Sequence, residues 1–146
     1  MIMSEEKLIR VNIVTPDGVV FTHRAQYVSV KTPIGGLTIL PNHIPIVTTL
    51  SIGPVTIKRR QDKGFENYVA VNGGMLQFSN NVCNIVADTA ERARDIDRER
   101  AERAKERAER ALHEAEELHD MAKLNRAKIA LNKAINRIGV SSRYGK

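Results

Sequence analysis

The stretch that decides the fold is residues 90–117, AERARDIDRERAERAKERAERALHEAEE. It consists almost entirely of Ala, Glu, Arg, Leu, Lys and Asp, without Gly or Pro and with Ile96 as its one β-branched residue. Most of these residue types have high helix propensity, and the two types that break helices are absent from the stretch. The composition therefore predicts one long helix from Ala90 through Glu117.

Small apolar residues recur at spacings of three and four along this helix, and a second stripe of the same spacing follows it, so each stripe lies on one helix face. His119 and Asp120 separate the two stripes, with Asp120 the expected N-cap and Gly139 the expected end of the second helix. This pattern predicts an antiparallel helical hairpin. Alanine buries little apolar area, so we expect the hairpin to open or repack readily. The stripes are Ala101, Ala104, Ala108, Ala111, Ala115 and Leu118, then Leu124, Ala127, Leu131, Ala134 and Ile138.

Charge is distributed differently on the two helices. The first helix mixes both signs at spacings that allow internal pairing, whereas the second helix and the tail have Asp120 as their one acidic residue. This asymmetry predicts an acidic partner for the second helix. The basic residues of that region are Lys123, Arg126, Lys128, Lys133, Arg137, Arg143 and Lys146.

The first half of the chain shows another pattern, with short apolar alternations between Leu8 and Ala87. The alternations are punctuated by residues 16–18 (PDG), 35–36 (GG) and 72–74 (NGG), which we expect to form turns. So many short strands in so few residues indicate a sandwich or a barrel. The predicted organisation is a β-sandwich domain at 1–88 followed by a helical hairpin domain at 89–146.

Several functional classes receive no support. The most apolar stretch, 37–55, is interrupted by three prolines, so we expect no membrane span. The start of the chain, 1–6, lacks the basic and apolar segments of a secretory signal, which predicts a cytosolic protein. Cys83 is the single cysteine and is expected to be a buried thiol, and the four histidines show no ligand spacing, so no metal site is expected.

Two other functional classes remain as alternatives. A formal net charge of +6 and a basic helix suit nucleic-acid binding, but the aromatic residues that would stack on bases are few and scattered. An enzyme on the sandwich would need a nucleophile with its base, or paired carboxylates, and the sequence assembles neither. We therefore expect no catalytic residue, no required cofactor and no nucleic-acid partner.

Three stretches carry a resemblance to a known family. They are residues 14–18 (VTPDG), 36–45 (GLTILPNHIP), and 71–74 (VNGG) with the later 90–97 (AERARDID). Together with the order of sandwich and hairpin, they resemble the epsilon subunit of bacterial F-type ATP synthases, named delta in mitochondria, over nearly the whole chain. In the family's glycine, isoleucine-leucine-proline, histidine and proline signature, a glycine more often occupies the position of Asn42.

This resemblance implies a non-catalytic subunit of the central stalk, or rotor, which couples proton flow to ATP synthesis. The sandwich would dock on the gamma subunit and the membrane rotor ring, placing the chain peripherally at the cytoplasmic face of the cell membrane. The hairpin would fold beside the sandwich or extend toward the alpha and beta catalytic subunits, where it would inhibit ATP hydrolysis.

Some bacterial members of this family bind ATP through Ile or Leu, Asp, two variable residues and Arg-Ala, and residues 96–101 here read IDRERA. The family usually has arginine where this chain has Lys133. By this resemblance, the regulatory ATP-binding residues are Glu91, Ile96, Asp97, Arg100, Ala101, Arg107, Lys133 and Arg137.

Helical spacing supports this set, because Arg100 and Arg107 lie seven residues apart beside the first stripe, and two basic residues flank the second. Four cations are thus expected to converge on one triphosphate. Asp97 is expected to accept hydrogen bonds from adenosine, and Ala101 to leave room for it. Lysine offers phosphate a point charge instead of a planar fork, so Lys133 is expected to change the affinity. The alternative is a solvated, salt-bridged helix surface. Without a Walker-type loop, ATP is expected to act as a signal.

Overall fold

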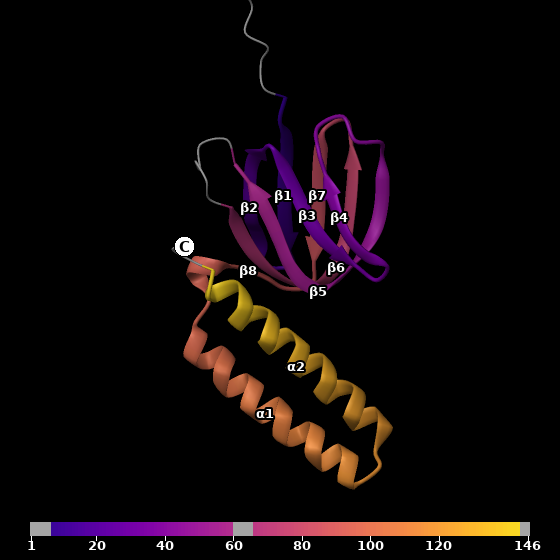
Figure 1. Ribbon diagram of the computed structural model, residues 1–146, viewed down its shortest axis with the longest axis vertical. Coiled ribbons are helices and arrows are strands. Elements are labelled where there is room, and N and C mark those ends of the chain that lie inside the picture. The colour runs from indigo at the N-terminus through magenta and orange to yellow at the C-terminus, as the bar shows by residue number, and fades with distance from the viewer. Residues whose placement is uncertain (1–6, 60–65, 144–146) are drawn as a thin grey trace, which may run out of the picture.

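The computed structural model describes residues 7–59 and 66–143. It consists of an N-terminal β-sandwich and a pair of antiparallel helices that project from one end of the sandwich (Figure 1). The predicted fold class, a sandwich of strands followed by a two-helix hairpin, is confirmed. Residues 1–6, on which the expectation of a cytosolic protein rests, and Lys146 of the basic tail lie outside the described residues.

The sandwich is built from one continuous sheet in the part of the chain that the structure describes. Its strand order is β2-β1-β7-β6-β5-β3-β4, and β8 pairs separately with β6. All neighbouring strands are antiparallel except β1 and β7. The strands are β1 (Ile9–Thr15), β2 (Gly18–Ala25), β3 (Tyr27–Thr32), β4 (Gly35–Ile39), β5 (Ile46–Lys58), β6 (Asn67–Ser79), β7 (Val82–Ala87) and β8 (Ala90–Arg92).

The two long strands, β5 and β6, connect the layers of the sandwich. β6 pairs with β8 through residues 69–71 and with β7 through residues 74–79, so its two halves have different neighbours. Strands that switch layers commonly do so at bends or bulges. Gly73 and Gly74 lie at the change, with φ of +89° and +145°, and a Cβ at Gly74 would come within 2.2 Å of the Val86 carbonyl oxygen. The expectation that this glycine pair ends a strand is wrong, because β6 continues past it.

The core confirms the alternation that the sequence predicts for the first strand. Ile9, Val11 and Ile13 are fully buried, and the phenyl rings of Phe21 and Phe78 fill the space between the layers with further aliphatic side chains. Branched and aromatic side chains suit this half-buried pleated surface. Cys83 is also buried, as expected, and burial raises the pKa of its thiol to about 12.

The predicted turns are correct in part. Residues 16–17 link β1 to β2, as expected from the PDG sequence. The β3–β4 hairpin turns at residues 33–34, so Gly35 and Gly36 open β4 instead of forming the turn. Asn42 has φ of +68°, a value that glycine and asparagine tolerate best. It also exchanges hydrogen bonds with Asn81, which fixes the loop to the β6–β7 turn.

The helical region begins later than the sequence predicts. Residues 90–92 form β8 on the edge of β6, and a 3-10 turn, η1 (Ala93–Asp95), follows. The prediction of a helix from Ala90 is therefore wrong at its start, because the free edge of β6 supplies backbone partners that a local propensity scale cannot anticipate. The predicted domain boundary after residue 88 falls just before β8. Helix α1 (Arg98–Glu117) starts after its N-cap, Asp97.

Helix α2 (Met121–Ser141) returns antiparallel to α1. The turn between them closes as a Schellman motif, with Asp120 N bonded to Ala115 O, His119 N bonded to Glu116 O, and His119 at φ of +53°. Asp120 caps α2 as predicted, accepting a hydrogen bond from Lys123 N. The helix runs through Gly139 and ends two residues later, so the expected stop at this glycine is wrong.

Candidate functional site

The two helices meet along a seam of alanines. Ala101, Ala108 and Ala115, at intervals of seven, are buried on α1, and Ala127 and Ala134 are buried on α2. These residues confirm part of the predicted stripe. Ala111 and Leu118 belong to the same predicted stripe but are exposed, Leu118 by 67%. The stripe is therefore wider than the contact it makes.

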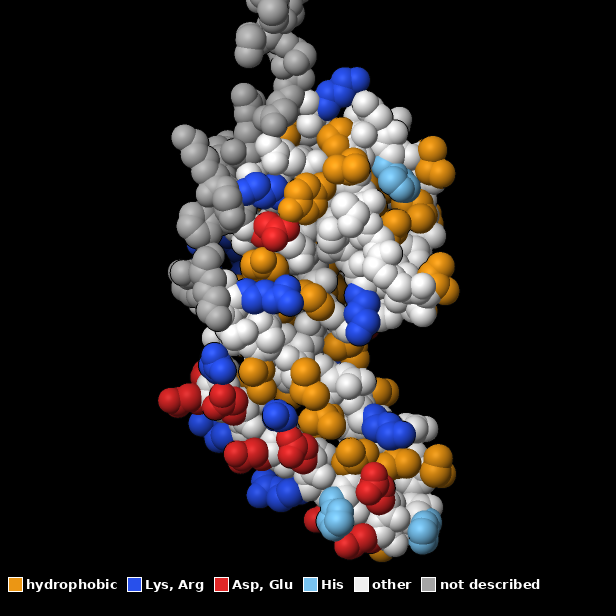
Figure 2. Space-filling view, viewed as in Figure 1, with side chains coloured by type: hydrophobic (Ala, Val, Ile, Leu, Met, Phe, Trp, Pro, Cys, Tyr) orange, Lys and Arg blue, Asp and Glu red, His pale blue; other side chains and the backbone are white. Residues whose placement is uncertain are grey.

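Alanines of both helices, some of them buried in the seam, form the floor of an open groove, which we call the helix groove. It has a volume of about 530 Å³, within the range of small-molecule sites, and side chains from both helices line it. Ala104, Ala108 and Ala111 of α1 face Ala127 and Ala130 of α2 there. Figure 2 shows hydrophobic side chains running along the hairpin between charged ones. The groove thus has an apolar floor and exists only while the helices are packed.

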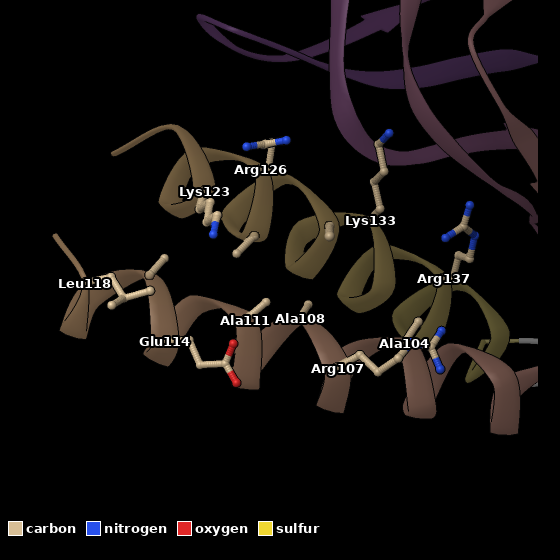
Figure 3. A pocket seen from close by; sticks show the side chains of 13 residues that line it. Ala104, Arg107, Ala108, Ala111, Glu114, Leu118, Lys123, Arg126, Lys133 and Arg137 are labelled. Carbon is tan, nitrogen blue, oxygen red and sulfur yellow. The ribbon is translucent and has the colours of Figure 1, made fainter. Parts of the chain in front are cut away.

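The rim of the helix groove is strongly basic. Five cationic side chains line it against one carboxylate, Glu114. Arg107 of α1 extends along its helix toward the end of the groove where Arg137 stands on α2 (Figure 3). Such a surface attracts anions, and guanidinium groups bind phosphate oxygens in paired hydrogen bonds. The five are Arg107, Lys123, Arg126, Lys133 and Arg137.

Arg137 also connects the hairpin to the sandwich. Its Nε donates a 2.8 Å hydrogen bond to Oε1 of Glu91 on β8. The side chains of Arg137 and Glu91 are 27% and 39% exposed, so water screens this ion pair in part. Arg137 is therefore placed both at the helix groove and at the junction of the two domains.

The structure distributes the other predicted ATP-binding residues over several roles. Ile96 packs against a small apolar cluster below the sandwich, and Asp97 accepts the hydrogen bond of Arg100 N as the helix cap. Ala101 is buried in the seam, and the exposed Arg100 does not line the helix groove. Three of the four predicted cations, Arg107, Lys133 and Arg137, line the groove, while Glu91 reaches it through Arg137.

The sequence reasoning missed the contact that holds α2 on the sandwich. Asn136 is buried, and its Nδ2 lies 3.2 Å from Val71 O and 3.3 Å from Asn72 Oδ1 on β6. Asn72 in turn donates to Thr89 Oγ1 at 2.9 Å. The one available signal was the i, i+4 spacing of Asn136 and the buried Val140, which marks a second face of α2.

Apolar contacts at this junction are few. Val140 packs with Ala70 and Ala93, and Tyr68 lies at the edge of this cluster with the Arg143 guanidinium 5.0 Å from its ring centroid. Buried polar contacts of this kind specify one docked position but add little net stability. The hairpin is thus docked through a small, mostly polar interface.

Within 7–59 and 66–143, no three His, Cys, Asp or Glu side chains gather in a way that would hold a metal ion. Over the same residues, no helix combines the length and apolar character needed to cross a membrane.

Two family models match the chain in succession. Residues 8–93 match the ATP synthase, Delta/Epsilon chain, beta-sandwich domain, and residues 94–142 match the ATP synthase, Delta/Epsilon chain, long alpha-helix domain. A protein named ATP synthase epsilon chain from Latilactobacillus sakei subsp. sakei is 50% identical over 142 residues, which cover 97% of this chain and 98% of that protein. Its namesake from Lactobacillus gasseri is 48% identical over 142 residues, covering 97% of both chains.

Solved structures share the fold at low sequence identity. A chain of the Euglena gracilis mitochondrial ATP synthase has a TM-score of 0.74 at 20% identity, covering 88% of this chain and 78% of its own. A chain of the Tetrahymena thermophila mitochondrial ATP synthase central stalk and c-ring structure has a TM-score of 0.53 at 17% identity, with coverage of 64% and 73%.

Proposed function

Because the chain belongs to the ATP synthase delta/epsilon chain family, we propose that it is a non-catalytic rotor subunit of the central stalk, which couples proton flow to ATP synthesis. In this proposal the sandwich docks on the gamma subunit and the membrane rotor ring. The chain then lies peripherally at the cytoplasmic face of the membrane. The match of both family models in the same order over most of the chain carries this assignment.

The hairpin is the regulatory part of the proposal. When it leaves the sandwich and extends, α2 reaches the alpha and beta catalytic subunits and inhibits ATP hydrolysis. Two features support a reversible release. The seam between the helices buries mainly alanine, which stabilises packing weakly, and α2 is held to the sandwich mostly by polar contacts. Helix α2 contains basic but no acidic residues, which suits acidic loops on its proposed targets.

ATP is the proposed ligand that keeps the hairpin folded. The helix groove carries this proposal, because its cations come from both helices and only the packed hairpin brings them together. A ligand that binds one state stabilises that state by RT ln(1 + [L]/Kd), which is about 1.4 kcal/mol at tenfold excess over Kd. Such a bias suffices to shift a weakly held hairpin, and it vanishes as ATP falls.

Arg137 links the groove to docking in this mechanism. Its Nε is bonded to Glu91, so a phosphate in the groove must share the guanidinium with that carboxylate. Arginine has five N–H donors and can bridge two anions. Binding at Arg137 would therefore leave α2 tied to β8 through the same side chain.

The ATP proposal is tested by calorimetric titration of the full chain. Arg107→Gln removes a cation of the helix groove and is expected to weaken ATP binding by about tenfold or more, since hydrogen bonds to charged groups contribute on the order of 1.5–3 kcal/mol. Arg110→Gln is the matched control, because Arg110 is exposed on α1 and does not line the groove. No binding at millimolar ATP, or equal loss in both variants, would contradict the site.

The subunit and inhibition proposals need the assembled enzyme. The chain is expected to co-purify with gamma and the catalytic subunits, and truncation after Asp95 is expected to raise ATP hydrolysis. That end point keeps β8 and η1, whereas truncation at 88 would remove a strand of the sheet. Unchanged hydrolysis would contradict inhibition by the hairpin, and failure to co-purify would contradict the subunit assignment.

A further inference from the structure

A second hollow, which shares Lys133 with the helix groove, lies between α2 and the sandwich. We call it the docking cleft. It has a volume of about 830 Å³, and its walls come from β3, the β3–β4 turn, β5 and β6 on one side and from the second half of α2 on the other. Clefts between domains are frequent ligand sites. A ligand here would touch both domains at once.

Two lysines stand on opposite walls of the docking cleft. Lys31 belongs to β3 and Lys133 to α2, and neither forms an ion pair with another residue of the described chain. The stem of Lys31 crosses Gly53 so closely that a Cβ there would lie 2.9 Å from Lys31 Cδ. Gly53 therefore leaves the space in which this stem is seated. Arg143 and Asp88 also line the cleft, which leaves it net basic.

Lys133 lines both hollows, and its side chain points toward the docking cleft. In Figure 3 its side chain extends from α2 on the side away from α1, whereas Arg107 runs along α1. Lysine presents a compact ammonium that binds phosphate oxygens as a point charge.

The remaining walls combine amide and apolar groups. Asn132 is exposed on the α2 wall, where its amide is available to a ligand. Ile129 and Ile135, which are 47% and 48% exposed, line the same wall, and Leu50 and Pro33 line the sandwich wall. This mixture suits an anion that carries an apolar body more than it suits a bare inorganic ion.

We propose that the docking cleft binds a small organic phosphate, with the phosphate between Lys31 and Lys133 and the apolar body against Ile129 and Ile135. Such a ligand bridges the sandwich and α2, so it stabilises the docked hairpin by mass action. The two proposed sites share Lys133, whereas Lys31 lines the docking cleft alone and Arg107 lines the helix groove alone. The docking cleft makes the docked state responsive to a second metabolite class.

The test is an NMR titration of the full chain with phenyl phosphate and, separately, with inorganic phosphate at matched ionic strength. Saturable shifts are expected at the backbone amides of residues 31 and 132–133, with tighter binding of phenyl phosphate. Lys31→Gln should weaken phenyl phosphate binding roughly tenfold, since a charged hydrogen-bonding partner is lost. Lys128→Gln, on an exposed position of α2 outside both hollows, should leave it unchanged.

The outcomes separate this proposal from the ATP proposal. Arg107→Gln should reduce ATP binding and leave phenyl phosphate binding intact. The absence of saturable shifts, or an equal response in Lys31→Gln and wild type, would overturn the docking-cleft site. Equal affinity for phenyl phosphate and inorganic phosphate would overturn the assignment of an apolar ligand body.

Discussion

The sandwich and the hairpin are stabilised by different kinds of buried side chain. The sandwich buries phenylalanine, isoleucine and valine completely, including Phe21, Phe78 and Ile85. The buried residues of the hairpin are alanines apart from Asn136 and Val140. Burying a large apolar side chain contributes about 1.5–3 kcal/mol, and alanine contributes far less. The comparison supports the proposal that a fixed domain carries a releasable one.

The largest expected effect would come from the sandwich core. Phe78→Ala should lower the free energy of unfolding by about 4 kcal/mol, because it removes a fully buried ring and leaves a cavity. Denaturant unfolding of the sandwich measures this change. Met75→Ala on the same strand is the control, since Met75 is 48% exposed, and it should cost less than about 1 kcal/mol. Similar losses of unfolding free energy in both variants would contradict the claim that large buried side chains stabilise the sandwich.

A smaller effect is expected at the junction. Asn136→Ala removes both hydrogen bonds from α2 to β6 and should weaken docking by about 1–2 kcal/mol while the sandwich keeps its stability. Hydrogen exchange measures this separately, because α2 amides should lose protection and core strand amides should not. Asn125→Ala, at an exposed position of α2, is the control. Equal loss in the strands would mean that both domains open as one unit.

The smallest effect is expected from the ion pair at the junction. A double-mutant cycle of Arg137→Gln and Glu91→Gln should give a coupling of about 0.5–1 kcal/mol for hairpin docking, because the pair is partly exposed. The same exchange experiment at low and high salt measures it. The coupling should shrink at high salt through screening. Zero coupling at low salt would show that Asn136 and the apolar cluster hold the junction alone.

Local patterns predict the parts of this molecule that depend on neighbours in sequence. The alternation of Ile9, Val11 and Ile13 and the capping role of Asp120 are examples, because periodicity and side-chain chemistry determine them. Local patterns fail where a segment distant in the sequence determines the local structure. Residues 90–92 have helical composition but join the sheet because the edge of β6 is open to them.

In the candidate site, too, local patterns identify some residues and miss those that depend on distant contacts. Arg107 and Arg137 are found by helical spacing, since both flank a visible stripe of alanines. The burial of Asn136 depends on a contact with Val71, 65 residues earlier, which no local pattern encodes. The sequence does not tell whether Gly73 and Gly74 form a turn or lie within a strand, because glycines with positive φ occur in turns and in strand irregularities alike.

The attachment of the hairpin has a mechanical consequence. Since β8 is bonded into the sheet, the proposed release of the hairpin would turn it about the segment between Arg92 and Asp97, close to where Val140 docks. This segment lies at one end of the hairpin. Helix α1 has 20 residues and is about 30 Å long at roughly 1.5 Å per residue, so the opposite end is far from it. In the proposed release, a small rotation near this segment would therefore move the far turn, at His119, over a large distance.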